Sequence, residues 1–112
     1  MAKHDPNLDM IFSSLGDPTR RAILQRLARG PATVSDLAGP FGMALPSFLG
    51  HLKKLESAGL IRTEKSGRVR SCALVPEALG PATDWLEAQR SLWDARLDRL
   101  DALVMQLKDT ST

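Results

Sequence analysis

Apolar residues recur at helical spacing in several segments that precede Gly59. The first segment has apolar side chains at positions 8, 11, 12 and 15 and stops at Gly16, so it predicts a short helix. A second helix is predicted to begin at Asp17-Pro18, because aspartate is a favoured N-cap and proline is tolerated at the first helical position. The pair Gly30-Pro31 ends it.

Two further helices are predicted between Thr33 and Ala58. Thr33 can cap a short helix that reaches about Ala38, because its hydroxyl is available to the backbone N–H three residues on. After several glycines, a fourth helix from Leu45 to Ala58 is amphipathic. We expect it to have one buried stripe, made of Leu45, Phe48, Leu49, Leu52 and Leu55. Two helices joined by a glycine-bearing turn, the second amphipathic, indicate a helix-turn-helix.

The pattern changes after the fourth helix. Segments 60–65 and 68–74 flank Ser66-Gly67, a good turn dipeptide, and predict a β-hairpin with basic residues near its tip. Beyond Pro81, apolar residues at alternating three- and four-residue steps predict a long helix over 81–108. The fold class is therefore mainly α with a small β-hairpin: a winged helix-turn-helix of about five helices and a two-stranded wing. We expect one domain, residues 1–112, because the chain is too short for two independent cores.

The last predicted helix is too long for the core of so small a domain. At 1.5 Å per residue it spans roughly 40 Å. We therefore expect a homodimer in which residues 1–16 and 81–108 are the dimerisation helices. The expected interface residues are Leu8, Ile11, Phe12, Leu86, Trp93, Leu97, Leu100 and Val104.

Composition narrows the class of protein. Apolar residues make up 43% of the chain and charged residues 25%, as in ordinary globular proteins. The sequence has neither an apolar stretch of membrane-spanning length nor an N-terminal signal peptide, so we expect a cytoplasmic location and no membrane partner. The net charge of +2 is unevenly distributed. Residues 44–75 carry six bases against two acids, whereas residues 81–112 carry four bases against six acids.

The basic stretch contains the residues that we expect to bind DNA. On the fourth helix, Ser47, Gly50, His51 and Lys54 form one ridge that could enter a major groove, while the hairpin bases would reach phosphates. The alternative is that Lys53 and Lys54 belong to a solvated face and that His51 is a surface histidine. The expected DNA-binding residues are Pro46, Ser47, Gly50, His51, Lys53, Lys54, Lys65, Arg68 and Arg70.

Three strings in this order resemble the ArsR/SmtB-type winged-helix repressors: residues 16–24 (GDPTRRAIL), 34–38 (VSDLA) and 51–61 (HLKKLESAGLI). The resemblance covers about residues 8–76 and implies a homodimer, operator binding as a repressor, and release by an unidentified effector. Many relatives carry a hydroxyl or amide where this chain has Ala44 or Leu49, and a base or histidine where it has Gly50. The chain is similar to a subgroup whose fourth helix starts Ala-Leu-Pro-Ser-Phe, here residues 44–48, and which lacks recognised metal ligands.

Metal-sensing relatives have a Cys-x-Cys in the third helix or an Asp/His and His/Glu set in the C-terminal helix, and this sequence has neither. His4 and His51 are far apart in sequence and Cys72 is the single cysteine, so we expect no metal and no cofactor. Cys72 could be a redox trigger beside Arg68 and Arg70, but we favour a packing cysteine. Trp85 and Trp93 could line an effector pocket; we favour interface anchors for them.

The sequence contains no phosphate-binding loop, nucleophile elbow or acid–base pair, so we expect no catalytic residues and no enzyme activity. The leading prediction is a sequence-specific DNA-binding regulator, a repressor that binds an inverted-repeat operator in duplex DNA as a homodimer. One alternative is a winged-helix module that binds only other proteins. Another is an accessory subunit of an enzyme, which would need a constitutive partner chain.

Overall fold

The computed structural model describes residues 5–110 and divides into two compact units, one up to Gly80 and one from Pro81 onward. The first of these units is called the body. Residues 1–4, which include His4, lie outside the described range. Both the predicted domain of residues 1–112 and the predicted dimerisation segment 1–16 begin with them.

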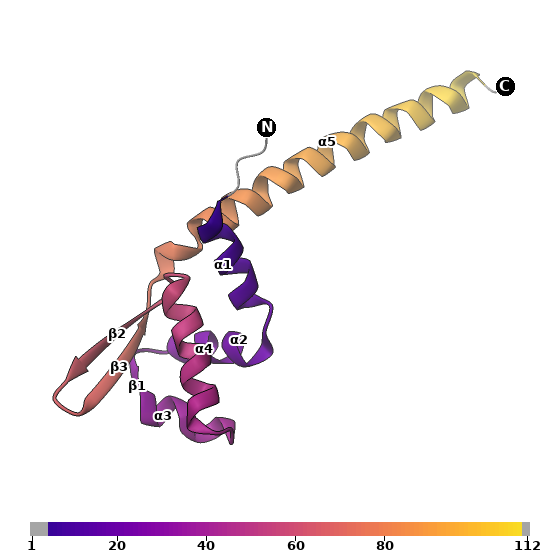
Figure 1. Ribbon diagram of the computed structural model, residues 1–112. Coiled ribbons are helices and arrows are strands. Elements are labelled where there is room, and N and C mark those ends of the chain that lie inside the picture. The colour runs from indigo at the N-terminus through magenta and orange to yellow at the C-terminus, as the bar shows by residue number, and fades with distance from the viewer. Residues whose placement is uncertain (1–4, 111–112) are drawn as a thin grey trace. The chain divides into compact units, whose positions relative to one another are not determined.

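The body contains four α-helices; the second, third and fourth begin where the sequence predicts, and two of the caps are the predicted ones (Figure 1). The side chain of Asp17 accepts a hydrogen bond from the Arg20 backbone N–H at 3.0 Å, and the Thr33 hydroxyl accepts one from the Asp36 N–H at 3.1 Å. Asp5 caps the first helix in the same way. The helices are α1 (Pro6–Leu15), α2 (Pro18–Leu27), α3 (Val34–Ala38) and α4 (Leu45–Ser57), with short 3-10 helices η1 (Gly39–Phe41) and η2 (Pro76–Leu79).

The β-structure is a three-stranded antiparallel sheet in the order β1-β3-β2. Its strands are β1 (Ala32–Thr33), β2 (Ile61–Ser66) and β3 (Val69–Leu74). The predicted hairpin is confirmed, but β1 was not predicted, because two residues that pair with a distant strand leave no periodic pattern. The turn also lies one residue later than predicted: Ser66 pairs with Val69, so Gly67 and Arg68 form the turn. Gly67 has a φ of 62°, which a glycine adopts without strain.

The core of the body lies between the helices and the sheet, and several large side chains in it are fully buried. Phe48 of α4 is completely buried and stacks at a tilt against Phe41, with ring centroids 5.4 Å apart. Cys72 of β3 is also buried, and burial raises the pKa of its thiol. A buried thiol with a raised pKa is unreactive, which supports a packing role for Cys72.

Two predictions about buried and exposed residues were wrong. Ile11, expected at a dimer interface, is completely buried within its own chain, because α1 packs against α2 and α4. Leu45 and Leu49, expected in the buried stripe of α4, are 55% and 36% exposed. The core reaches Phe48, Leu52 and Leu55 only, since the other two leucines lie to one side of that stripe.

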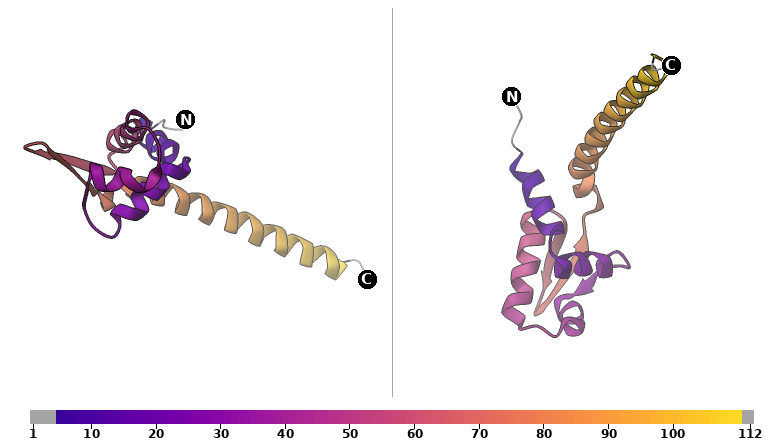
Figure 2. Two further views of the ribbon diagram at one scale, coloured as in Figure 1. Left: turned by 90° about the horizontal axis from the view of Figure 1, so that it is seen from below. Right: turned by 90° about the vertical axis from the view of Figure 1, so that its right-hand side faces the viewer.

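The second unit is made by α5 (Gly80–Thr110), a single helix of 31 residues that confirms the long helix predicted over 81–108. At 1.5 Å per residue its length is roughly 46 Å. Figure 2 shows α5 as one unbroken helix. Its apolar side chains are largely exposed, including Trp93 at 61% and Leu97 at 57%. Within residues 5–110, no helix is both long enough and apolar enough to cross a membrane.

Candidate nucleic-acid interface

The outward side of α4 presents most of the residues that the sequence assigns to DNA. Pro46, Ser47, Gly50, Lys53 and Lys54 are exposed, whereas His51 is only partly exposed. Gly50 has an ordinary helical backbone, and a Cβ built on it would meet no other atom within 4 Å. A flat surface can therefore approach the backbone of α4 closely at this glycine.

His51 is held by an arginine that the sequence pattern did not single out. Arg20 of α2 is buried, and its guanidinium approaches the His51 ring with Nη1 to Nδ1 at 3.2 Å. The same guanidinium donates to the carbonyl oxygens of Ser13 and Ser14 at 2.9 and 3.0 Å. These carbonyls belong to the last turn of α1, where the regular helical donors run out and the Gly16 N–H also donates to Ser13. Arg20 therefore ties the end of α1 to the middle of α4.

The Arg20 contact fixes the hydrogen-bonding role of His51. A guanidinium only donates hydrogen bonds, so Nδ1 of His51 accepts and the ring proton of the neutral histidine lies on Nε2. The expected DNA contact of His51 can then be made only by the Nε2–H donor. Arg20 could have been identified from the sequence as a base just after a helix end whose carbonyls need donors.

Asp17 completes this polar cluster. Its carboxylate Oδ2 lies 3.7 Å from Nδ1 of His51 and caps α2. The hydrogen bond from the Arg20 N–H, aided by the charge of Arg20, lowers the pKa of Asp17 below its ordinary value of 3.8. The cluster orients α4 relative to α2 through contacts on one flank of the helix.

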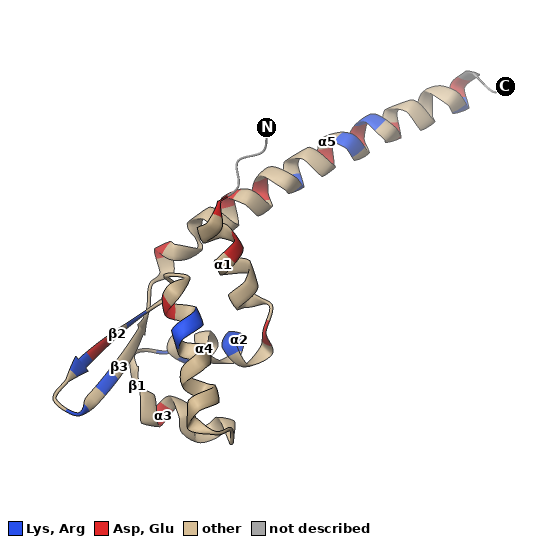
Figure 3. Cartoon of the chain, viewed as in Figure 1, with Lys and Arg blue, Asp and Glu red and all other residues tan. Residues whose placement is uncertain are grey.

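The hairpin places the other expected bases away from the helices. Lys65, Arg68 and Arg70 are exposed, and Arg68 lies in the turn itself. Figure 3 shows basic residues on both strands of the hairpin and on α4, whereas acidic and basic residues alternate along α5. The basic residues that the sequence assigns to DNA thus come from two elements, α4 and the β2–β3 hairpin, and α2 adds the exposed Arg21.

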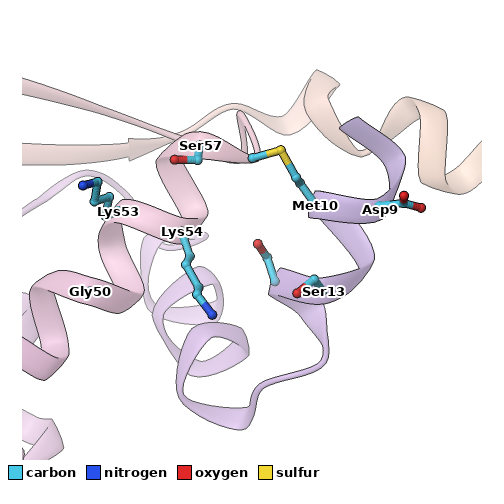
Figure 4. Close-up of a pocket in the computed structure, with 8 residues that line it drawn as sticks. Asp9, Met10, Ser13, Gly50, Lys53, Lys54 and Ser57 are labelled. Carbon is cyan, nitrogen blue, oxygen red and sulfur yellow. The ribbon is translucent and has the colours of Figure 1, made fainter. Parts of the chain in front are cut away.

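Two hollows flank α4. A groove of about 520 Å³ lies between α1 and α4, with Met10, Ser13 and Ser57 among its lining residues. Lys53 and Lys54, which also line it, leave α4 in different directions (Figure 4). A smaller hollow of about 280 Å³, between α4 and the hairpin, is lined by Leu49, Leu52, Lys53, Glu56, Thr63 and Arg70.

A metal site was not expected from the sequence. Among residues 5–110, no three histidine, cysteine, aspartate or glutamate side chains lie close enough together to hold a metal ion.

Comparison with known proteins adds the family. Residues 15–64 match a helix-turn-helix domain model. The chain is 39% identical over 71 residues to the HTH-type transcriptional regulator Rv2034 of Mycobacterium tuberculosis, a match that covers 63% of this chain and 66% of that protein. It is 32% identical over 79 residues to the transcriptional repressor SdpR of Bacillus subtilis, covering 70% of this chain and 88% of SdpR.

A solved structure agrees. The crystal structure of the ArsR family transcriptional regulator RHA00566 is 57% identical in sequence and superposes with a TM-score of 0.75, covering 79% of this chain and 97% of that one. The predicted winged-helix fold and the resemblance drawn from three short strings are both confirmed. The chain belongs to the ArsR family of winged helix-turn-helix transcriptional regulators.

Proposed function

We propose that this ArsR-family regulator is a homodimeric repressor that binds an inverted-repeat operator in duplex DNA. In this proposal the regulator is located in the cytoplasm. It acts by binding DNA and catalyses no reaction. α4 enters the major groove, and the β2–β3 hairpin lies on the neighbouring phosphates.

The observation that carries this proposal is that α4 and the β2–β3 hairpin of the same body both present exposed basic side chains. Lys53 and Lys54 on α4 and Lys65, Arg68 and Arg70 on the hairpin are all exposed. Neutralising phosphates with such bases releases counterions and provides affinity for any sequence. Ser47, and Nε2–H of His51, are the side-chain donors on α4 that could add base readout.

The dimer is supported by α5. Leu86, Trp93, Leu97, Leu100 and Val104 follow steps of seven, four, three and four residues, which keep them on one side of a helix. These five side chains are between 45% and 61% exposed. A second copy of α5 offers the matching apolar stripe. The expected contribution of Leu8 and Phe12, which are partly buried, stays a prediction.

The proposal is tested by selecting bound duplexes from random oligonucleotides and measuring affinity at several salt concentrations. We expect a symmetric motif whose half-site centres lie about 10 base pairs apart, one helical turn, and an affinity that falls steeply as salt rises. Alanine at Ser47 or His51 should weaken binding to the selected motif more than binding to random DNA.

The alternative function is a module that binds only proteins. The exposed leucines of α4 favour it, because apolar surface is common at protein interfaces. Absence of any salt-dependent DNA binding would support this alternative and overturn the proposal. Binding that depends on salt but yields no symmetric motif would leave a non-specific DNA-binding protein.

A further inference from the structure

Leu45 and Leu49 lie on the body surface although the sequence pattern assigns them to the core. They are four residues apart, so they stand one above the other on the same side of α4. With exposures of 55% and 36% they place branched methyl groups in solvent. The proposed DNA-binding function gives no role to either side chain.

The first two turns of α4 have little capacity for hydrogen bonds from side chains. From Ala44 to Gly50 the sequence is ALPSFLG, in which the Ser47 hydroxyl is the single side-chain group that can form a hydrogen bond. Recognition helices contact base edges mainly through their N-terminal residues. Apart from the Ser47 hydroxyl, any direct readout by these two turns must therefore come from apolar contact.

The major groove offers one apolar group among the four ordinary bases, the C5-methyl of thymine. Cytosine has a hydrogen at this carbon, and purines have no equivalent group. A leucine facing the groove therefore distinguishes thymine from cytosine without a hydrogen bond.

The surroundings of Leu49 favour a polyanion over an apolar protein surface. The hollow that Leu49 lines is also lined by Lys53 of α4 and Arg70 of β3. Glu56 lies in the same hollow, where it accepts a hydrogen bond from the Thr63 hydroxyl. Lys53 and Arg70 could bind the phosphate backbone while the adjacent leucine contacts a thymine methyl group.

We propose that Leu45 and Leu49 are specificity-determining residues that contact the C5-methyl groups of thymines in each half-site. The inference rests on the proposed DNA-binding function. Both leucines contribute by removing methyl surface from water, so each contacted methyl is worth about a fourfold change in affinity.

The experiment replaces each thymine of the selected duplex by deoxyuridine, one symmetric pair of positions at a time. This change removes only the methyl group and leaves every hydrogen-bonding atom in place. Affinities are measured at one salt concentration for the wild-type dimer, Leu45→Ala and Leu49→Ala. Both sites are exposed and alanine favours helices, so the thermal midpoints of the variants should match the wild type.

We expect the wild-type protein to lose about fourfold in affinity per contacted methyl at one or two positions of each half-site. Leu49→Ala should bind the thymine and deoxyuridine duplexes equally at its own position and keep the discrimination at the position of Leu45. The matched control is Lys54→Ala, which should weaken binding to every duplex while retaining the preference for thymine.

Three outcomes overturn the inference. Equal wild-type affinity for all deoxyuridine duplexes, with the salt-dependent binding intact, would refute methyl readout and leave the proposed function standing. Discrimination that survives at every contacted position in both leucine variants would assign the methyl contact to other residues. A wild-type protein that binds no duplex at low salt would refute both the inference and the proposed function, and a protein partner would then explain the two leucines.

Discussion

The body and α5 differ in the solvent exposure of their apolar side chains. In the body, Ile23, Phe48 and Leu55 are completely buried, whereas Trp93 and Leu97 of α5 are more than half exposed. Both regions show the same helical spacing of apolar residues in the sequence. The difference shows that such a pattern identifies an apolar face that must be buried. It does not show whether the same chain or a second chain buries it.

The largest expected effect tests the body. Phe48→Ala should lower the free energy of unfolding by about 3–5 kcal/mol, because it leaves a cavity in a packed core. Urea denaturation measures this change. The control is Leu97→Ala, which removes exposed surface in α5 and should leave the unfolding of the body nearly unchanged when the protein is dilute enough to be monomeric. Equal destabilisation by the two variants would remove the contrast between the regions.

The second prediction tests α5. Leu97→Glu should convert the dimer to monomer, because it places a charge at a leucine whose burial in the proposed interface is worth about 1.5–3 kcal/mol per chain. Light scattering measures the mass in solution, and circular dichroism checks that the helices persist. A variant that still forms a stable, folded dimer would show that this stripe of α5 is not the interface.

The third prediction tests whether the hydrogen bonds of the buried Arg20 stabilise the body. Arg20→Met should lower the free energy of unfolding by about 2 kcal/mol, because the Ser14 carbonyl and the ring of His51 lose the hydrogen bonds from Arg20 and the Ser13 carbonyl keeps only the one from the Gly16 N–H. Arg20→Lys should restore this only partly, since an ammonium cannot reproduce the planar fork. If methionine left stability unchanged and affinity for the operator intact, Arg20 would have no positioning role.

The fourth prediction separates the two regions by charge. Alanine at both Arg68 and Arg70 should reduce the slope of log affinity against log salt by about one unit for each phosphate that these arginines no longer neutralise. The matched pair in α5 is Arg96 and Arg99, whose replacement should leave the slope unchanged. A lower slope from the α5 pair would show that DNA phosphates contact α5, contrary to the proposal.

The smallest effect concerns acid stability of the body. The folded pKa of Asp17 is lowered, so its stabilising contribution is present above the ordinary pKa of 3.8 and is lost as the pH falls through the folded value. Asp17→Asn keeps a good cap but removes the charge, so the acid dependence of the melting temperature should become shallower. Thr33→Asn, at a cap that does not titrate, is the control and should leave it unaltered.

The sequence predicted what local chemistry controls. The caps at Asp17 and Thr33 set the starts of α2 and α3, and the proline and glycine positions set most helix ends. It did not predict contacts between distant segments, such as the pairing of Ala32 with Cys72 or the contact of Arg20 with His51. Nor could periodicity predict the exposure of Leu49, because the width of the covered face depends on neighbouring elements.

Gly50 has a consequence for how this protein can change over generations. A Cβ added there meets nothing outside its own helix backbone within 4 Å, and replacing a glycine within a helix by alanine stabilises it by about 0.5–1 kcal/mol. Substitution of Gly50 by alanine should therefore not impair folding. In a duplicated gene, a single codon change at Gly50 could give a copy with a new operator preference and an unaltered scaffold, so this glycine is a site at which paralogues can diverge.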